Sequence, residues 1–214
     1  MGGGGSAPQG RRHQRGPDRR ASRPRSPARL SGLLPPGGET PGSAVALLLA
    51  YDGTAYRGWQ VQRDARTVQG TVRDALRPLL GDRVRVMGAS RTDAGVHALG
   101  QVASVSGGRA VPPAAMMAAL NATLPRDIRV RGVRAVPPGF DARRAARLKR
   151  YVYLVATDPV PWPFLRGYTW NPGRRLNPAA MRAAAGALRG RHDFSAFRAA
   201  AGRGRPPVCH LSSL

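Results

Sequence analysis

Apolar positions in the first part of the chain follow strand and helix periods in turn. An uninterrupted apolar run, residues 44–51, ends at the turn-forming dipeptide Asp52-Gly53, as expected for a strand. Apolar residues then recur three and four positions apart, which predicts a helix over residues 68–80 that ends before Gly81. The residues that carry this period are Val68, Val72, Ala75, Leu76 and Leu79.

The same part of the chain continues with two strands, a helix and a further strand. Valine and arginine alternate over residues 83–86, and residues 96–105 form a mostly apolar run of strand length. Two prolines open a helix predicted over residues 112–120, and apolar residues at 128–130 indicate another strand. The predicted order is therefore strand, helix, strand, strand, helix, strand, and residues 89–95 join the two middle strands.

The second part of the chain begins with a similar pattern. Residues 151–155, Tyr-Val-Tyr-Leu-Val, have the aromatic and β-branched side chains typical of a strand. Asn177 and Pro178 provide an N-cap and a first-turn residue for a helix that ends before Gly190. We therefore expect one continuous sheet in a mixed α and β fold.

Residues 1–43 differ in composition from the rest of the chain. They hold eight arginines and two acidic residues among Gly, Pro and Ser, with almost no apolar residues before Leu30. Such a segment buries too little apolar surface to offset its ordering entropy, so we expect a disordered basic tail. An RNA-tethering arm and an organelle transit peptide are the alternatives. The folded part divides into one half at residues 44–140 and another at residues 141–214.

Composition limits the classes of partner and of chemistry. The formal net charge of +24 indicates a polyanionic partner, with nucleic acid ahead of a membrane surface. The single cysteine, Cys209, excludes an internal disulfide framework and a cysteine-rich zinc site. The longest apolar run has eight residues, whereas a membrane-spanning helix needs about 20. We expect a soluble protein without a metal site.

The polar stretch between the two middle strands carries the candidate chemistry. Asp93 lies in it two residues before Gly95, which permits a sharp backbone turn, and two residues after Arg91. A guanidinium paired with the carboxylate favours its ionised form and fixes its direction. Such a carboxylate is a candidate nucleophile or base toward a polyanionic substrate. The spacing alone also fits a structural role in an Asx-turn or a surface ion pair.

A longer set of motifs adds a family resemblance. Residues 91–98, Arg-Thr-Asp-Ala-Gly-Val-His-Ala, resemble the active-site signature of the TruA-type tRNA pseudouridine synthases. Six further stretches resemble family motifs in the family's order, so the seven motifs are distributed over residues 45–198, which are most of the folded part. They are Tyr51-Asp52-Gly53-Thr54 with Gly58-Trp59-Gln60, Val68-Gln69-Gly70, Leu120-Asn121 with Leu124-Pro125 and Asp127-Ile128, Phe140-Asp141-Ala142-Arg143, Arg150-Tyr151-Val152-Tyr153, and His192-Asp193-Phe194 with Phe197.

The resemblance implies a fold, a substrate and site residues. The fold is the α+β pseudouridine synthase fold, in which two ferredoxin-like (RRM-like) halves share a central, mainly antiparallel sheet. Family members continue beyond the position that matches Leu214, so we expect the second half to be incomplete here. The implied substrates are uridines 38–40 in the anticodon arm of tRNA, bound by a homodimer, with the cytoplasm as the expected location. Asp93 is implied as the catalytic aspartate, Arg91 as its neighbour and Tyr151 as the aromatic that stacks on the target uracil.

Pseudouridine formation suits these residue types. The bond from ribose C1′ to uracil N1 breaks, the base rotates, and C5 bonds to C1′, so no redox change, metal or organic cofactor is needed. A carboxylate either attacks C1′ or removes a ribose proton to give a glycal, and the sequence leaves both routes open. Stacking on Tyr151 returns about 1–3 kcal/mol of the cost of flipping the base. Of the other aromatic residues, Tyr153 and Trp59 are expected in the core.

A cluster of basic residues directly precedes Tyr151 and is a candidate for phosphate contacts. We call it the basic segment; it comprises Arg143, Arg144, Arg147, Lys149 and Arg150. Two other functional classes remain open. A truncated tRNA-binding protein without turnover would bind in a salt-sensitive way and form no product. A carboxylate-metal nuclease is disfavoured because the aspartates form no paired set of ligands.

Overall fold

The computed structural model describes residues 33–35, 44–197 and 207–213. They belong to two compact units that divide between Arg147 and Leu148. The predicted basic tail, residues 1–43, lies outside the described residues except for residues 33–35. Within the described part, no helix is long and apolar enough to cross a membrane.

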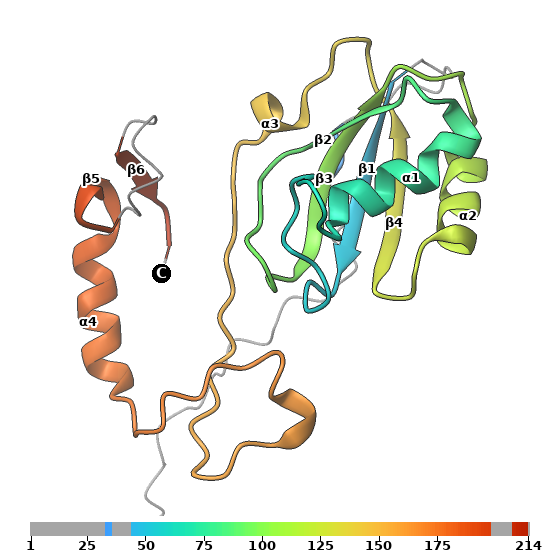
Figure 1. The fold of residues 1–214 in the computed structure, drawn as a ribbon. Helices are drawn as coiled ribbons and strands as arrows, with labels where there is room; N and C mark the ends of the chain where they lie inside the picture. Colours follow the sequence, from blue (N-terminus) through green and yellow to red (C-terminus); the bar gives the residue numbers. More distant parts are fainter. Residues whose placement is uncertain (1–32, 36–43, 198–206, 214) are drawn as a thin grey trace, which may run out of the picture. The chain divides into compact units, whose positions relative to one another are not determined.

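The first unit is a four-stranded antiparallel sheet with two helices packed on one face (Figure 1). Its elements are β1 (Val45–Tyr51), α1 (Val68–Leu80), β2 (Arg85–Gly88), β3 (Ala98–Ser106), α2 (Pro113–Thr123), β4 (Ile128–Ala135) and the short α3 (Ala142–Ala145). The strand order is β2-β3-β1-β4. This βαββαβ unit has the ferredoxin-like topology, and it confirms the order of elements predicted for this part of the chain.

Local signals define α1 as predicted. The Thr67 side chain accepts a hydrogen bond from the main-chain N–H of Gly70 and caps the first turn. The helix ends at Gly81, whose φ is +94° and whose N–H donates to the carbonyl of Arg77. The apolar face is buried against the sheet at Val68, Val72, Leu76 and Leu80.

Strand β1 is buried on both faces, which explains its uninterrupted apolar run. Leu47 and Leu49 pack with α1 and α2 in the main core. Leu48 packs on the opposite face in a smaller cluster that includes Leu34 and Val136. Leu34 belongs to the segment for which we predicted disorder, but it is buried because its side chain covers this second face of the sheet.

The described residues of the second unit form one α-helix, a two-stranded antiparallel pair and two short 3-10 helices, η2 (Pro163–Leu165) and η3 (Ser195–Phe197). Helix α4 (Pro178–Leu188) is capped by Asn177, whose side chain accepts from the N–H groups of Ala179 and Ala180, as its sequence predicts. Strands β5 (Gly190–Asp193) and β6 (Val208–Leu211) pair with each other. The described residues form a four-stranded sheet and a two-stranded sheet, so the prediction of one continuous sheet is not confirmed.

The prediction of a strand at residues 151–155 is wrong. This segment makes only one isolated β-bridge, between Val155 and Trp170. Its aromatic and β-branched residues favour a strand, but among the described residues no segment pairs with it along its length, and a strand requires such a partner. Tyr153 is 81% exposed and so lies outside any core. Trp59 is buried, as expected.

Candidate active site

Asp93 lies on the loop that connects β2 with β3, where the sequence predicted it. The base of this loop is fixed by Gln101 of β3, whose side-chain amide donates to the Ser90 carbonyl at 2.6 Å. At the tip, Gly95 has a φ of +77° and the Val96 N–H donates to the Asp93 carbonyl at 3.2 Å. The Asp93 side chain therefore stands at an exposed turn on an anchored base.

The loop between β1 and α1, residues 52–67, lies directly against the Asp93 loop. The N–H of Trp59 donates to the carbonyl of Thr92 at 2.9 Å, and the N–H of Gly95 donates to the carbonyl of Tyr56 at 3.2 Å. A side chain at Gly58 would place its Cβ 2.5 Å from the Thr92 carbonyl oxygen. The two loops thus approach so closely that only glycine fits at this position.

Side-chain contacts add to this backbone pairing. The hydroxyls of Tyr51 and Thr92 share a hydrogen bond at 2.9 Å, and burial raises the pKa of the Tyr51 phenol. The Gly53 N–H donates to His97 Nδ1 at 3.2 Å, and the same nitrogen lies 3.1 Å from Asp52 Oδ1. The sequence around His97 gives no sign of these contacts, because the residues that meet it are more than 40 positions away.

Asp93 lines a pocket of about 280 Å³. The lining residues come from both loops and are mainly polar: Arg57, Gln60, Gln62, Arg91, Thr92, Asp93 and Ala94. Arg91 and Asp93 both line this pocket, but among the described contacts no hydrogen bond or ion pair joins them, although the sequence had led us to expect such a pair. Arg57, Gln60 and Gln62 were missed, because nothing in their local sequence indicates that they meet Asp93.

The pocket combines an exposed carboxylate with two guanidiniums and two amides. None of the hydrogen bonds or ion pairs of the described residues engages the Asp93 carboxylate, so it is available as a nucleophile or a base. The guanidiniums of Arg57 and Arg91 suit an anionic ligand group such as a phosphate. Within the described ranges, no group of three or more His, Cys, Asp or Glu residues is arranged to hold a metal ion.

Comparisons with known proteins agree with this arrangement. The sequence model of the tRNA pseudouridine synthase family matches residues 48–143, a range that includes both loops of the pocket. The tRNA pseudouridine synthase A of Acetivibrio thermocellus is 43% identical over 164 residues, which are 77% of this chain and 67% of the relative. The chain belongs to the tRNA pseudouridine synthase family.

Other relatives support the assignment to this family of isomerases, which convert uridine to pseudouridine. The tRNA pseudouridine synthase A of Myxococcus xanthus is 45% identical over 170 residues, covering 79% of this chain and 64% of the relative. That of Geobacter sulfurreducens is 43% identical over 170 residues, with shares of 79% and 70%. The chain thus spans about two thirds of the length of these tRNA pseudouridine synthases.

The other candidate residues are the basic segment and Tyr151, which lie at the end of the first unit and in the second unit of this tRNA pseudouridine synthase family member. All five members of the basic segment are exposed. The Asp141 side chain accepts from the N–H groups of Arg143 and Arg144 and caps α3, and so it pairs with their main chain. Tyr151 is 71% exposed and belongs to the second unit, whereas Asp93 belongs to the first.

Proposed function

We propose that this protein isomerises uridine to pseudouridine in the anticodon arm of tRNA, at uridines 38–40, with Asp93 as the catalytic carboxylate. The supporting observation is the exposed Asp93 side chain in a basic pocket, on a loop that two main-chain hydrogen bonds hold against its neighbour. Membership of the tRNA pseudouridine synthase family makes uridine in tRNA the substrate to test.

Three charged pocket residues and Tyr151 have roles in this proposal. The Asp93 carboxylate attacks ribose C1′, or removes a ribose proton to give a glycal, and in both routes the bond from C1′ to N1 breaks. The uracil rotates and C5 bonds to C1′, while the Asp93–C1′ bond breaks in the first route or the ribose regains its proton in the second. The C5 proton then leaves, and N1 takes up a proton. Arg57 and Arg91 bind phosphates next to the flipped nucleotide, which offsets part of the cost of unstacking it. Tyr151 stacks on the uracil.

The rest of the molecule serves tRNA binding in this proposal. The basic segment contacts backbone phosphates, which gives affinity and registration without reading bases. The proposal also includes the two-half pseudouridine synthase fold, a homodimer that holds one tRNA, and a cytoplasmic location. No resident metal or cofactor takes part in it.

The direct test uses the full 214-residue chain and an anticodon-arm transcript with uridines at positions 38–40. Pseudouridine is detected by carbodiimide treatment and primer extension. Asp93→Asn should form no product above background, because the amide is neither a nucleophile nor a base. The matched control is Asp74→Asn, since Asp74 is an exposed aspartate of α1 that pairs with Arg73 and Arg77. Equal product from wild type and Asp93→Asn refutes the role of Asp93.

The same assay separates the alternative function. If the wild-type chain binds the transcript in a salt-sensitive way but forms no pseudouridine over hours, it is a tRNA-binding protein without turnover. The binding measurement also keeps Asp93→Asn interpretable, because this variant should bind tRNA as the wild type does.

A further inference from the structure

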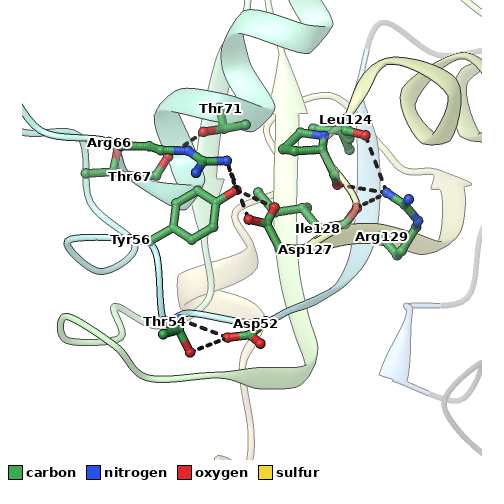
Figure 2. A network of polar contacts seen from close by, with 11 residues as sticks. Asp52, Thr54, Tyr56, Arg66, Thr67, Thr71, Leu124, Asp127, Ile128 and Arg129 are labelled. Atoms are coloured by element: carbon green, nitrogen blue, oxygen red, sulfur yellow. Dashed lines mark hydrogen bonds and ion pairs between the residues drawn. The ribbon is translucent and has the colours of Figure 1, made fainter. Parts of the chain in front are cut away.

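The loop that supports Asp93 is itself held by a buried tyrosine. Tyr56 is 2% exposed, and its hydroxyl donates to Asp127 Oδ1 at 2.6 Å (Figure 2). The Arg66 guanidinium lies 4.5 Å from the centre of the Tyr56 ring and donates to the hydroxyl at 3.0 Å. Arg66 also pairs with Asp127 Oδ2 at 3.5 Å. Two side chains of one loop and Asp127, which is at least 61 positions further along the chain, therefore close one network.

Asp127 lies on a turn that is fixed independently of this network. The turn joins α2 with β4, and the Arg129 side chain donates to its carbonyls at Pro125 and Ile128, at 2.8 and 2.6 Å (Figure 2). The main-chain carbonyl of Asp127 accepts from the N–H of Asp52 at 2.9 Å. Asp127 thus offers the Tyr56 hydroxyl a fixed acceptor.

The hydrogen bond from Tyr56 keeps its direction over a wide pH range. Burial, together with the bonded Asp127 carboxylate, raises the pKa of the Tyr56 phenol to about 12. The phenol is therefore protonated and donates wherever an enzyme of this kind works. Arg66 supports it by covering the ring face, where a cation is favourable.

We propose that Tyr56 and Asp127 are positioning residues for Asp93. The path runs from the Asp127 carboxylate to the Tyr56 hydroxyl, and from the Tyr56 carbonyl to the N–H of Gly95, two residues after Asp93. Neither side chain lines the pocket, so they act through the backbone of the Asp93 loop. Arg57, which follows Tyr56, does line the pocket, and the hydrogen bond from Tyr56 to Asp127 fixes its position as well.

This inference rests on the proposed function for its kinetic consequence but not for its structural one. The structural test is hydrogen exchange in the full-length chain, at the amides of Gly95 and Trp59 that bridge the two loops. Tyr56→Phe removes only the hydroxyl and should speed exchange at both amides by about tenfold. The matched control Tyr153→Phe removes an exposed hydroxyl and should leave them unchanged. Unchanged exchange in Tyr56→Phe overturns the proposal.

The kinetic test compares single-turnover rates with tRNA affinity. Tyr56→Phe and Asp127→Ala should each lower the rate about tenfold, with the Kd for tRNA changed less than about twofold, because a misplaced carboxylate slows chemistry and not binding. The double variant should lose no more than either single variant. Asp127→Asn keeps an oxygen acceptor for the hydroxyl and should retain most of the rate.

A purely structural role gives a different result. It would lower the melting temperature while the rate per folded molecule and the Gly95 exchange stayed at wild-type values, and this outcome overturns the proposal. Tyr56→Phe is the decisive variant if Asp127→Ala does not fold. A wild-type chain that forms no pseudouridine refutes the proposed function, and the exchange experiment then decides the positioning role alone.

Discussion

Gly58→Ala tests how tightly the Asp93 loop is held by its neighbour. Gly58 has a φ of +86°, a conformation that costs a residue with a side chain about 1–2 kcal/mol. The added Cβ would also lie 2.5 Å from the Thr92 carbonyl oxygen and 3.1 Å from the Asp93 carbonyl carbon. Both are main-chain atoms and cannot rotate away, so the Asp93 loop must move by about 1 Å to restore a normal contact.

This displacement has a cost in stability and in activity. It weakens the hydrogen bond from the Trp59 N–H to the Thr92 carbonyl, which contributes about 0.5–1.5 kcal/mol. With the conformational cost, Gly58→Ala should lower the free energy of unfolding by about 1.5–3.5 kcal/mol. With Asp93 in the role proposed above, a shift of this size should lower the rate of pseudouridine formation about 100-fold.

Gly139→Ala is the matched control. Gly139 has a φ of +82°, but nothing lies within 4 Å of the place that an added Cβ would take, so only the conformational cost applies. Thermal and urea unfolding followed by circular dichroism measure stability, and single-turnover assays measure the rate. The control should lose about 1–2 kcal/mol and keep the wild-type rate. Equal losses of stability and equal rates in the two variants would refute the close packing of the two loops.

Further predictions concern the core, a titration and the charge. Leu47 has no exposed surface, and Leu47→Ala should lower the free energy of unfolding by about 2–5 kcal/mol in urea titrations. The control Leu99→Ala, at a 76% exposed position, should change it by less than about 0.5 kcal/mol. Similar values for the two variants would contradict the assigned core. The pKa of Tyr56 is raised from 10.0 to about 12 in the folded chain, so the stability it contributes is complete below pH 10 and is lost as the pH rises toward 12. The wild type should therefore lose more stability than Tyr56→Phe over this pH window, and parallel curves would speak against the raised pKa. Replacing each residue of the basic segment with glutamine should make the affinity for tRNA depend less on salt concentration. The slope of log affinity against log salt should fall by about 0.7–0.9 for each phosphate that is no longer neutralised. An unchanged slope would exclude phosphate binding by this segment.

Local patterns determined much of the first unit. The period of α1 and its end at Gly81 are both visible within 15 residues of sequence, because helix hydrogen bonds join neighbouring residues. The cap at Asn177 predicted α4 for the same reason. Residues 151–155 have an equally strong strand composition but remain largely unpaired, because strand formation depends on a partner elsewhere in the chain.

The candidate site also combines features that the sequence determines with features that only the tertiary structure determines. Asp93 and Arg91 stand in one short motif, so the sequence alone located the carboxylate and its loop. The tertiary structure alone placed Arg57 in the pocket and joined Tyr56 to Asp127 over 71 positions. Such contacts depend on which loops the sheet order β2-β3-β1-β4 brings side by side, and no local periodicity encodes that distance. The candidate carboxylate could therefore be found from the sequence, whereas the groups that line its pocket and contact its loop required the fold.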